Sequence, residues 1–180
     1  MENSDTFIEV VNIKLVSEKK IYSDKSVRTP EDAVKVLGAE LCKYNRECFA
    51  IVNLQTDMRI INFNICSIGS IDAAIVSTAE IFKCALLSNA AQIMVMHNHP
   101  SGNTKPSKED ISVTKKIAEA CRLMNIGFID HIIVGEMGNY YSFRENNQID
   151  SSNHNVDRSG EINKFYNENK YRRNGKEARR

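Results

Sequence analysis

The apolar positions of this chain follow two periods, one typical of β-strands and one typical of α-helices. Residues 48–54 and 92–97 are nearly continuous apolar runs, which predicts strands that are buried on both faces. Residues 61–65 alternate between apolar side chains and asparagines after a turn at residues 56–57, which predicts a hairpin partner with one solvent-facing side. Further strands are expected at residues 7–16, as an edge strand, and at residues 127–134 and 139–143.

Apolar residues at helical spacing predict two amphipathic helices before residue 92. The first covers residues 30–44, with Thr29 as the N-cap and Asp32 three residues later, the arrangement that closes a capping box. The second begins after Ser77, and Glu80 has the same relation to that cap residue. Both segments carry an apolar stripe on one side, so we expect each to pack on a sheet.

The predicted order of elements, β-α-β-β-(β)-α-β-α-β-β, combines hairpins with helical crossovers. It indicates an α/β (α+β) fold in which helices flank a mixed β-sheet. A length of 180 residues fits an N-terminal strand or extension at 1–26, one domain at 27–149 and a polar basic tail at 150–180. Residues 151–180 hold eight Lys or Arg, four Asp or Glu and few apolar residues, so we expect the tail to be disordered.

Composition narrows the environment of the protein. The formal net charge is +1, so no global field favours nucleic acid or a membrane surface. Residues 1–5 are polar and acidic, unlike a secretory signal, and no apolar run approaches the ~18–20 residues of a membrane span. The five cysteines are odd in number and lack a Cys-x-x-Cys spacing, which favours reduced thiols over disulfides. We therefore expect a cytoplasmic protein.

The strongest candidate for chemistry lies where the strand at 92–97 ends. His97 and His99 are two residues apart, so a strand directs both imidazoles to one face, with Cα atoms ~6.6 Å apart. Asp110 lies within ~20° of the apolar stripe of the next helix, expected at 107–124. A buried carboxylate needs a partner, and a metal ion held by the two histidines would be one. Such a site leaves one tetrahedral position open for water, as in catalytic zinc sites.

Ser107 and Asp110 also fit a simpler role. Ser107-x-x-Asp110 is a variant of the capping box, which would explain both residues without a metal ion. The capping role and the metal role are compatible. A histidine on its own in a strand is more often a structural group than a ligand, so the metal hypothesis rests on the combination of residues.

The segment His97-Asn98-His99-Pro100-Ser101-Gly102, followed by Pro106-Ser107-x-x-Asp110, resembles the JAMM (MPN+) metal motif, and more closely that of its RadC branch. The resemblance runs from about Glu47 to residues 140–145, about two thirds of the chain. It implies a JAB/MPN metalloprotease-like fold (a cytidine deaminase-like sandwich). It also implies a metallopeptidase or isopeptidase with one Zn²⁺ per chain on His97, His99 and Asp110, and water as the fourth ligand.

Amide hydrolysis also requires a group that moves protons, and glutamate is a common choice. Glu80 would be explained by its helix cap, whereas Glu47 has no local explanation beyond a surface position at a strand start. The catalytic glutamate of JAMM enzymes lies in a motif similar to residues 47–52, so the resemblance implies Glu47 as general acid/base. It likewise implies that the Ser107 hydroxyl helps to stabilise the oxyanion. His131, in an apolar strand, is expected to have a hydrogen-bonded structural role.

Two functions from different classes follow. The first is a zinc-dependent metallohydrolase that cleaves an amide bond in a protein or peptide, with ubiquitin-like conjugates among the substrates that the resemblance implies. The second is a RadC-like DNA-repair or mobile-element accessory protein that binds nucleic acid or a protein partner without peptidase activity. Residues 151–180 would serve the second function or form only a solvated terminus. Full-length RadC proteins carry a helix-hairpin-helix region that the first ~28 residues here do not resemble. The complete ligand set favours the first function.

Overall fold

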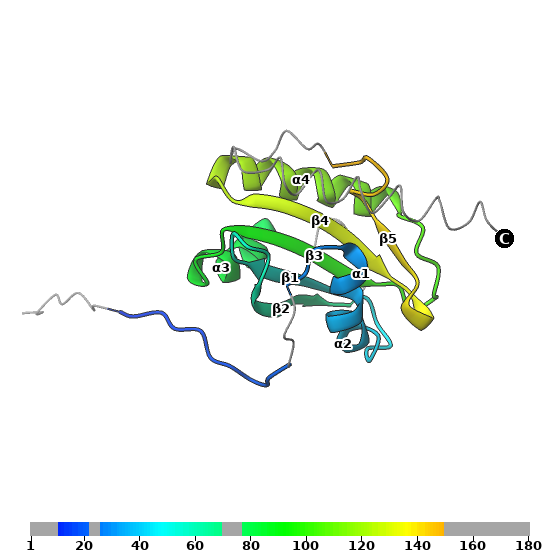
Figure 1. The fold of residues 1–180 in the computed structure, drawn as a ribbon, viewed down its shortest axis with the longest axis horizontal. Helices are drawn as coiled ribbons and strands as arrows, with labels where there is room; N and C mark the ends of the chain where they lie inside the picture. The colour runs from blue at the N-terminus through cyan, green and yellow to red at the C-terminus, as the bar shows by residue number, and fades with distance from the viewer. Residues whose placement is uncertain (1–10, 22–25, 70–76, 150–180) are drawn as a thin grey trace, which may run out of the picture.

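The computed structural model describes residues 11–21, 26–69 and 77–149. Its centre is a five-stranded sheet in the order β2-β1-β3-β4-β5 (Figure 1). The strands are β1 (Cys48–Leu54), β2 (Ile60–Ile68), β3 (Gln92–Asn98), β4 (Gly127–Val134) and β5 (Tyr140–Ser142). Only the β3–β4 pair is parallel among these neighbours, and the other three pairs are antiparallel. The predicted α/β (α+β) fold with a mixed sheet is confirmed.

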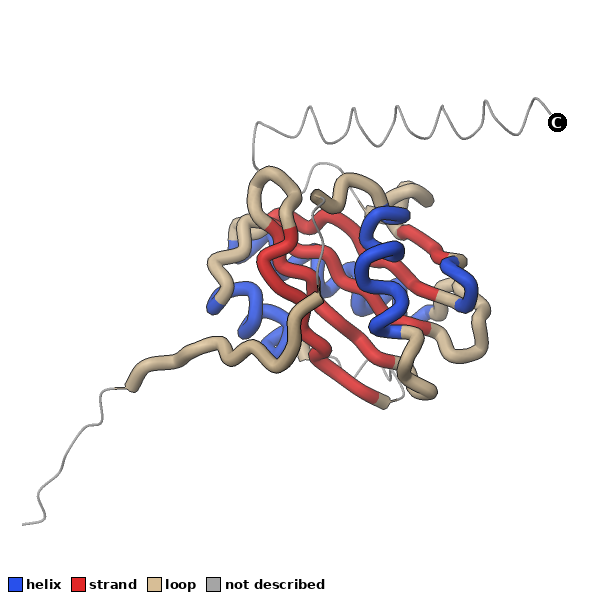
Figure 2. Tube along the Cα trace, turned by 60° about the horizontal axis from the view of Figure 1, so that its bottom comes forward, coloured by secondary structure: helices blue, strands red, loops and turns tan. Residues whose placement is uncertain are grey.

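Helices flank this sheet on both faces (Figures 1 and 2). They are α1 (Pro30–Ala33), the π-helical η1 (Val34–Gly38), α2 (Ala39–Leu41), α3 (Thr78–Leu87), α4 (Lys108–Met124) and the short 3₁₀ helix η2 (Glu136–Gly138). The predicted helix at 30–44 is thus one helical stretch over residues 30–41 with a π-helical middle. Its predicted capping box is confirmed, since the N–H of Asp32 donates to Thr29 Oγ1 at 3.1 Å.

Alternation along the central strands divides the core into two apolar clusters, because successive strand side chains point to opposite faces. Phe49 and Ile51 of β1 pack with α3 and α4, whereas Ala50 and Val52 pack with the helices of residues 30–41. Strand β1 is buried along its whole length, as its continuous apolar run predicts. The face that carries Phe49 is also the face on which the candidate site lies.

Strand β2 departs from the predicted alternation. Ile61 packs on the side of α3 and α4, while Phe63 and Ile65 pack on the opposite side of the sheet. One irregularity in the β1–β2 register explains the difference, because Asn53 pairs with Asn62 and Leu54 with Ile60, which leaves Ile61 as an extra residue that breaks the alternation. Asn62 is not simply solvated either: it accepts a hydrogen bond from Asn53 Nδ2 at 2.6 Å.

The predicted edge strand at residues 7–16 is wrong for the part that the structure describes. Residues 11–16 belong to no strand, and they run away from the sheet with Val11 71% exposed (Figure 1). Strand propensity alone does not pair a segment with a sheet. Residues 7–10, and the tail expected at 150–180, lie outside the described residues. Within the described ranges, every helix is too short or too polar to cross a membrane.

Candidate metal centre

The end of strand β3 presents the two predicted histidines. His97 is the last but one residue of β3 and is fully buried, and His99 continues the pairing, since its N–H donates to the carbonyl of Val134 at 2.9 Å. Both side chains leave the same face of the sheet, and their Nε2 atoms lie 3.0 Å apart. The predicted convergence of the two imidazoles is therefore present.

Asp110 meets the histidines from the first turn of α4. It is 2% exposed, with Oδ1 3.2 Å from His97 Nε2 and Oδ2 3.6 Å from His99 Nε2. The Ser107 capping box is also formed, because the N–H of Ser107 donates to Asp110 Oδ2 at 2.8 Å and Ser107 Oγ accepts from the N–H of Asp110 at 3.0 Å. The predicted capping role of Asp110 is therefore present, in the same side chain that faces both histidines, and its role as a metal ligand stays a prediction.

Three potential ligand atoms, one from each of His97, His99 and Asp110, all lie within 4.8 Å of one another. This is a possible metal-binding triad built from imidazole and carboxylate groups, the donors that suit zinc and related transition metals. His99 is oriented by a second contact, because its Nδ1 lies 2.6 Å from the carbonyl of Asn103. A carbonyl only accepts, so Nδ1 carries a proton and a neutral His99 keeps its lone pair on Nε2.

Burial and close contacts set the charges of the triad. Burial lowers the pKa of His97 below its usual value of 6.5, which favours the neutral imidazole. Contact with Asp110 raises the pKa of the more exposed His99. Burial works to raise the pKa of Asp110, but its contacts with both histidines outweigh burial and hold the pKa well below the usual 3.8. The triad therefore combines an anionic carboxylate with imidazoles whose Nε2 atoms face one another.

Behind His97 lie two polar residues that extend the site into the core. His131 Nε2 is 2.8 Å from His97 Nδ1, and His131 Nδ1 is 2.6 Å from Thr114 Oγ1. The expected hydrogen-bonded role of His131 is present, but its partner is a triad residue itself. Thr114 was not singled out by the sequence. The available signal was its place one helical turn after Asp110, on the same face of α4.

Glu47 lies at the entrance to β1, beside the triad. Phe49 pairs with His97 across the antiparallel strands, so continuing that register by two residues sets Glu47 opposite His99 and on the same face. Glu47 is half-buried, and its negative charge acts to raise the pKa of both His97 and His99. Glu47 therefore lies close enough to act electrostatically on both histidines, and its catalytic role stays a prediction.

Asn98, between the two histidines, holds the backbone on which Glu47 lies. Its Oδ1 accepts from the N–H of Cys48 at 2.8 Å, and its Nδ2 donates to the carbonyls of Arg46 at 3.0 Å and Tyr44 at 3.3 Å. Asn98 points away from its histidine neighbours, because strand residues alternate between faces. This contact was also missed by the sequence, since it joins residues about fifty positions apart.

Comparison with known protein families matches residues 27–148 to the RadC-like JAB domain. The chain belongs to this family. It is 41% identical over 133 residues to a UPF0758 protein of Listeria innocua, which covers 74% of this chain and 58% of that protein. It is 39% identical over 125 residues to a UPF0758 protein of Caldanaerobacter subterraneus, which covers 69% of this chain and 53% of that protein. The chain thus spans somewhat more than half the length of these relatives.

Glu80, the other glutamate considered in this RadC-like JAB domain, does not have its predicted role in a helix cap. Ser77 is the N-cap of α3, but among the described residues its side chain makes no capping hydrogen bond. The predicted Ser77–Glu80 capping box is therefore not formed. The Glu80 carboxylate instead contacts Lys83 Nζ at 2.8 Å on the exposed side of the helix. It is a solvated i,i+3 ion pair, which contributes little to stability.

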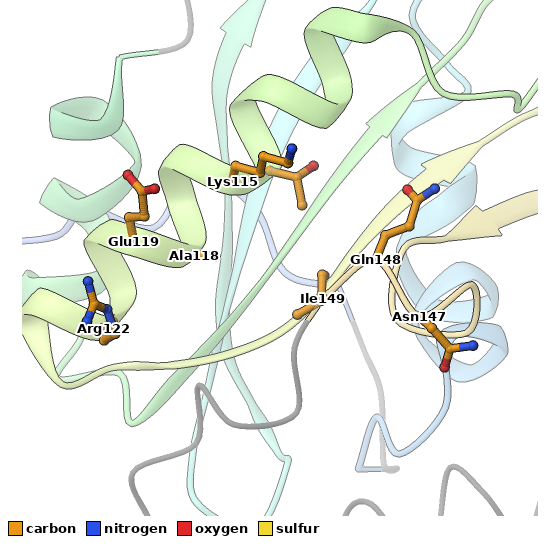
Figure 3. Close-up of a pocket in the computed structure, with 8 residues that line it drawn as sticks. Lys115, Ala118, Glu119, Arg122, Asn147, Gln148 and Ile149 are labelled. Carbon is orange, nitrogen blue, oxygen red and sulfur yellow. The ribbon is translucent and has the colours of Figure 1, made fainter.

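A hollow of about 290 Å³ lies between α4 and the segment after β5 (Figure 3). Its lining includes Lys115, Glu119 and Arg122 of α4, and Gln148 and Ile149 from the segment. It shares Thr114 with the hydrogen-bonded residues behind His97, but it contains none of the triad. The pocket is therefore separate from the candidate metal centre.

Proposed function

We propose that this protein is a zinc-dependent metallohydrolase, a JAMM-type metallopeptidase or isopeptidase that cleaves an amide bond. The observation that carries the proposal is the 3.0 Å approach of His97 Nε2 and His99 Nε2. Two imidazole nitrogens at this distance beside an anionic carboxylate favour a shared cation. Membership of the RadC-like JAB family supports the same reading.

The residues present fit a single Zn²⁺ ion. His97, His99 and Asp110 would hold it, with a fourth position left for water, which is the ligand number of catalytic rather than structural zinc sites. Zinc bound there would lower the pKa of a coordinated water toward neutrality and polarise the substrate carbonyl. Both effects require donors of this kind in a partly buried pocket, and two of the three residues are almost fully buried.

Glu47 and Ser107 supply the remaining groups. Glu47, opposite His99 on the same face, would accept a proton from the attacking water and deliver it to the leaving amine. Ser107 donates its hydroxyl hydrogen to Asp110 Oδ2 at 2.6 Å, and rotation of that hydroxyl would present a donor to the oxyanion of the tetrahedral intermediate. Asn98 would keep Glu47 at the distance that proton transfer requires.

The substrate that we propose is a protein or peptide, with an isopeptide-linked ubiquitin-like conjugate as the first candidate. This rests on the resemblance to JAMM enzymes rather than on a feature of the candidate metal centre. We also propose a cytoplasmic location, supported by the five free cysteines of the chain.

The deciding experiment measures metal content and hydrolysis together. We expect about one zinc per chain in the purified protein by elemental analysis, lost in His97→Ala and Asp110→Ala and kept in Glu47→Gln. Cleavage of isopeptide-linked ubiquitin dimers and of a mixed fluorogenic peptide library should require zinc and should be abolished by Glu47→Gln. A well-folded protein that takes up no zinc, even when zinc is added, would contradict the proposal.

The alternative is an accessory protein that binds nucleic acid. Its support is the net charge of +4 over residues 151–180, from eight basic and four acidic residues. A salt-dependent gel shift with double-stranded DNA that disappears on deletion of residues 151–180 would favour it. Zinc-dependent hydrolysis without any shift at low salt would favour the metallohydrolase.

A further inference from the structure

A chain of hydrogen bonds connects His97 to the backbone of Asp110 through the core. His97 Nδ1 lies 2.8 Å from His131 Nε2, and His131 Nδ1 lies 2.6 Å from Thr114 Oγ1. Thr114 Oγ1 in turn donates to the carbonyl of Asp110 at 2.5 Å. His97 and His131 are fully buried and Thr114 is 2% exposed. The chain thus begins at one triad residue and ends at another.

The last bond fixes the direction of all the others. A carbonyl only accepts, so the single hydroxyl hydrogen of Thr114 is committed to Asp110. Thr114 Oγ1 must then accept from His131, which places a proton on His131 Nδ1. A neutral His131 keeps a lone pair on Nε2 and accepts from His97 Nδ1. His97 therefore carries its proton on Nδ1, and its Nε2 lone pair faces His99 and Asp110.

Aromatic packing fixes the orientation of the His97 and His131 rings. The ring of His131 stacks on Phe143, with centroids 4.7 Å apart and planes 6° apart, and meets Phe49 edge-on at 5.4 Å. The ring of His97 stacks on Phe49, with centroids 5.8 Å apart. A core that required packing alone would be filled by apolar side chains, because buried polar groups are costly unless they are hydrogen-bonded. His97, His131 and Thr114 are polar, and each of the hydrogen bonds that link them to the Asp110 carbonyl has one donor and one acceptor.

We propose that Thr114 and His131 are positioning residues that hold His97 as the Nδ1-protonated tautomer and so aim its Nε2 lone pair at the metal position. The inference deepens the proposed function and depends on the same triad. The hydroxyl of Thr114 contacts the main-chain carbonyl of Asp110 and the ring of His131. We therefore expect it to affect metal affinity through these contacts and not as a ligand. It also joins two triad residues, because Thr114 lies on the helix that carries Asp110.

The test compares three variants of α4 in the full-length chain. Thr114→Val keeps the shape of the side chain but removes the hydroxyl, Thr114→Ser keeps the hydroxyl, and Val113→Ala weakens the packing of the neighbouring residue, which is 1% exposed. Zinc affinity is measured by competition with a chromophoric chelator. We expect Thr114→Val to bind zinc ~10–100-fold more weakly, as substitutions behind metal-ligating histidines usually do. Thr114→Ser and Val113→Ala should stay close to the wild type.

A spectroscopic measurement checks the mechanism without relying on activity. The ¹⁵N chemical shifts of the His97 imidazole, recorded for zinc-free and zinc-loaded protein, report which nitrogen carries the proton. We expect the proton on Nδ1 in both forms of the wild type and a mixture of tautomers in zinc-free Thr114→Val. His131→Phe keeps a stacked ring but removes the acceptor, and should lose the same preference.

The outcomes separate this inference from the proposed function. Zinc binding with the expected tautomer but no hydrolysis of any substrate would overturn only the metallopeptidase proposal. A wild type with the His97 proton on Nε2, or Thr114→Val with wild-type zinc affinity, would overturn the positioning role. Equal losses of zinc affinity in Val113→Ala and Thr114→Val would also overturn it, because the effect would then be one of helix packing. A wild type that binds no zinc would refute both.

Discussion

The hydroxyl of Ser107 lies 2.6 Å from Asp110 Oδ2 and donates to it, while the N–H of Asp110 donates back to Ser107 Oγ at 3.0 Å. The other carboxylate oxygen, Oδ1, lies 3.2 Å from His97 Nε2. The short Asp110 side chain therefore accepts from the N-cap residue of α4 and also faces both histidines of the triad. The capping contact uses Oδ2 and the contact with His97 uses Oδ1. Substitutions can therefore separate the capping role of Asp110 from its role in the triad.

Asp110→Asn should abolish metal binding while leaving the helix cap largely in place. The amide oxygen still accepts from the N–H of Ser107, but the negative charge is lost. Asp110→Ala removes both roles and should lower the free energy of unfolding of the zinc-free protein by ~1–2 kcal/mol more than Asp110→Asn does. Urea unfolding of zinc-free protein and chelator competition measure the two effects. Wild-type zinc affinity in Asp110→Asn would show that the carboxylate is no ligand.

Asn98→Ala should impair catalysis more than zinc binding. The substitution leaves the N–H of Cys48 without its acceptor and frees the carbonyls of Arg46 and Tyr44, so the backbone on either side of Glu47 loses its fixed position. We expect kcat to fall ~10-fold or more through misplacement of the general base, with a stability loss of ~1–3 kcal/mol. Elemental analysis should still find zinc. Unchanged kcat in a zinc-loaded Asn98→Ala protein would show that Glu47 needs no such support.

Asp130 should give the free energy of unfolding a pH dependence that Asp130→Asn lacks. Complete burial raises the pKa of Asp130 from 3.8 to about 7, although Ser142 and the N–H groups of His131 and Arg144 donate to it. The folded state therefore binds a proton more tightly than the unfolded state. The contribution of this group to stability falls as the pH rises from about 4 to about 7, by on the order of 4 kcal/mol.

Urea unfolding of both proteins, in steps of about one pH unit from about pH 5 to about pH 8, measures the difference directly. The triad histidines titrate in both proteins, so their contribution cancels in the comparison. The stability of the wild type relative to Asp130→Asn should decrease with pH. A difference that stays constant or rises with pH would show that the carboxyl is ionised in the folded state throughout this range.

Removal of zinc should lower the stability of the wild type but not that of a protein without the triad. A metal ion that binds only the folded state stabilises it by about 2.7 kcal/mol when its free concentration is 100 times the dissociation constant. Chelator should therefore lower Tm in the wild type and in Glu47→Gln, and leave the Tm of His97→Ala unchanged. Differential scanning calorimetry with and without zinc measures this. An identical shift in His97→Ala would place the stabilising ion elsewhere.

Much of the site was predictable because its residues lie within single elements of known period. A two-residue spacing on a strand sets His97 and His99 on one face, and helical geometry turns Asp110 inward with Ser107 as its cap. The fold class followed from the same periods, together with capping pairs such as Thr29 and Asp32. These features need no knowledge of which elements are neighbours.

Features that depend on pairing were predicted less well. The alternation of residues 61–65 gave the wrong face for Ile61, because the register irregularity that makes Ile61 an extra residue of the β1–β2 pair is not visible in the sequence of either strand alone. Residues 11–16 have the composition of a strand but no partner in the described sheet. The Ser77–Glu80 capping box has the right spacing, yet Glu80 contacts Lys83 instead.

The sequence by itself determined the local geometry of the triad, because the direction of a side chain within a strand or helix depends only on its position in that element. Only the tertiary structure decided what stands behind the triad. The parallel pairing of β3 with β4 brings His131 to His97, and the packing of α4 on the sheet brings Thr114 to His131. Those contacts depend on the register and packing of elements that lie far apart in the chain, which no local period encodes.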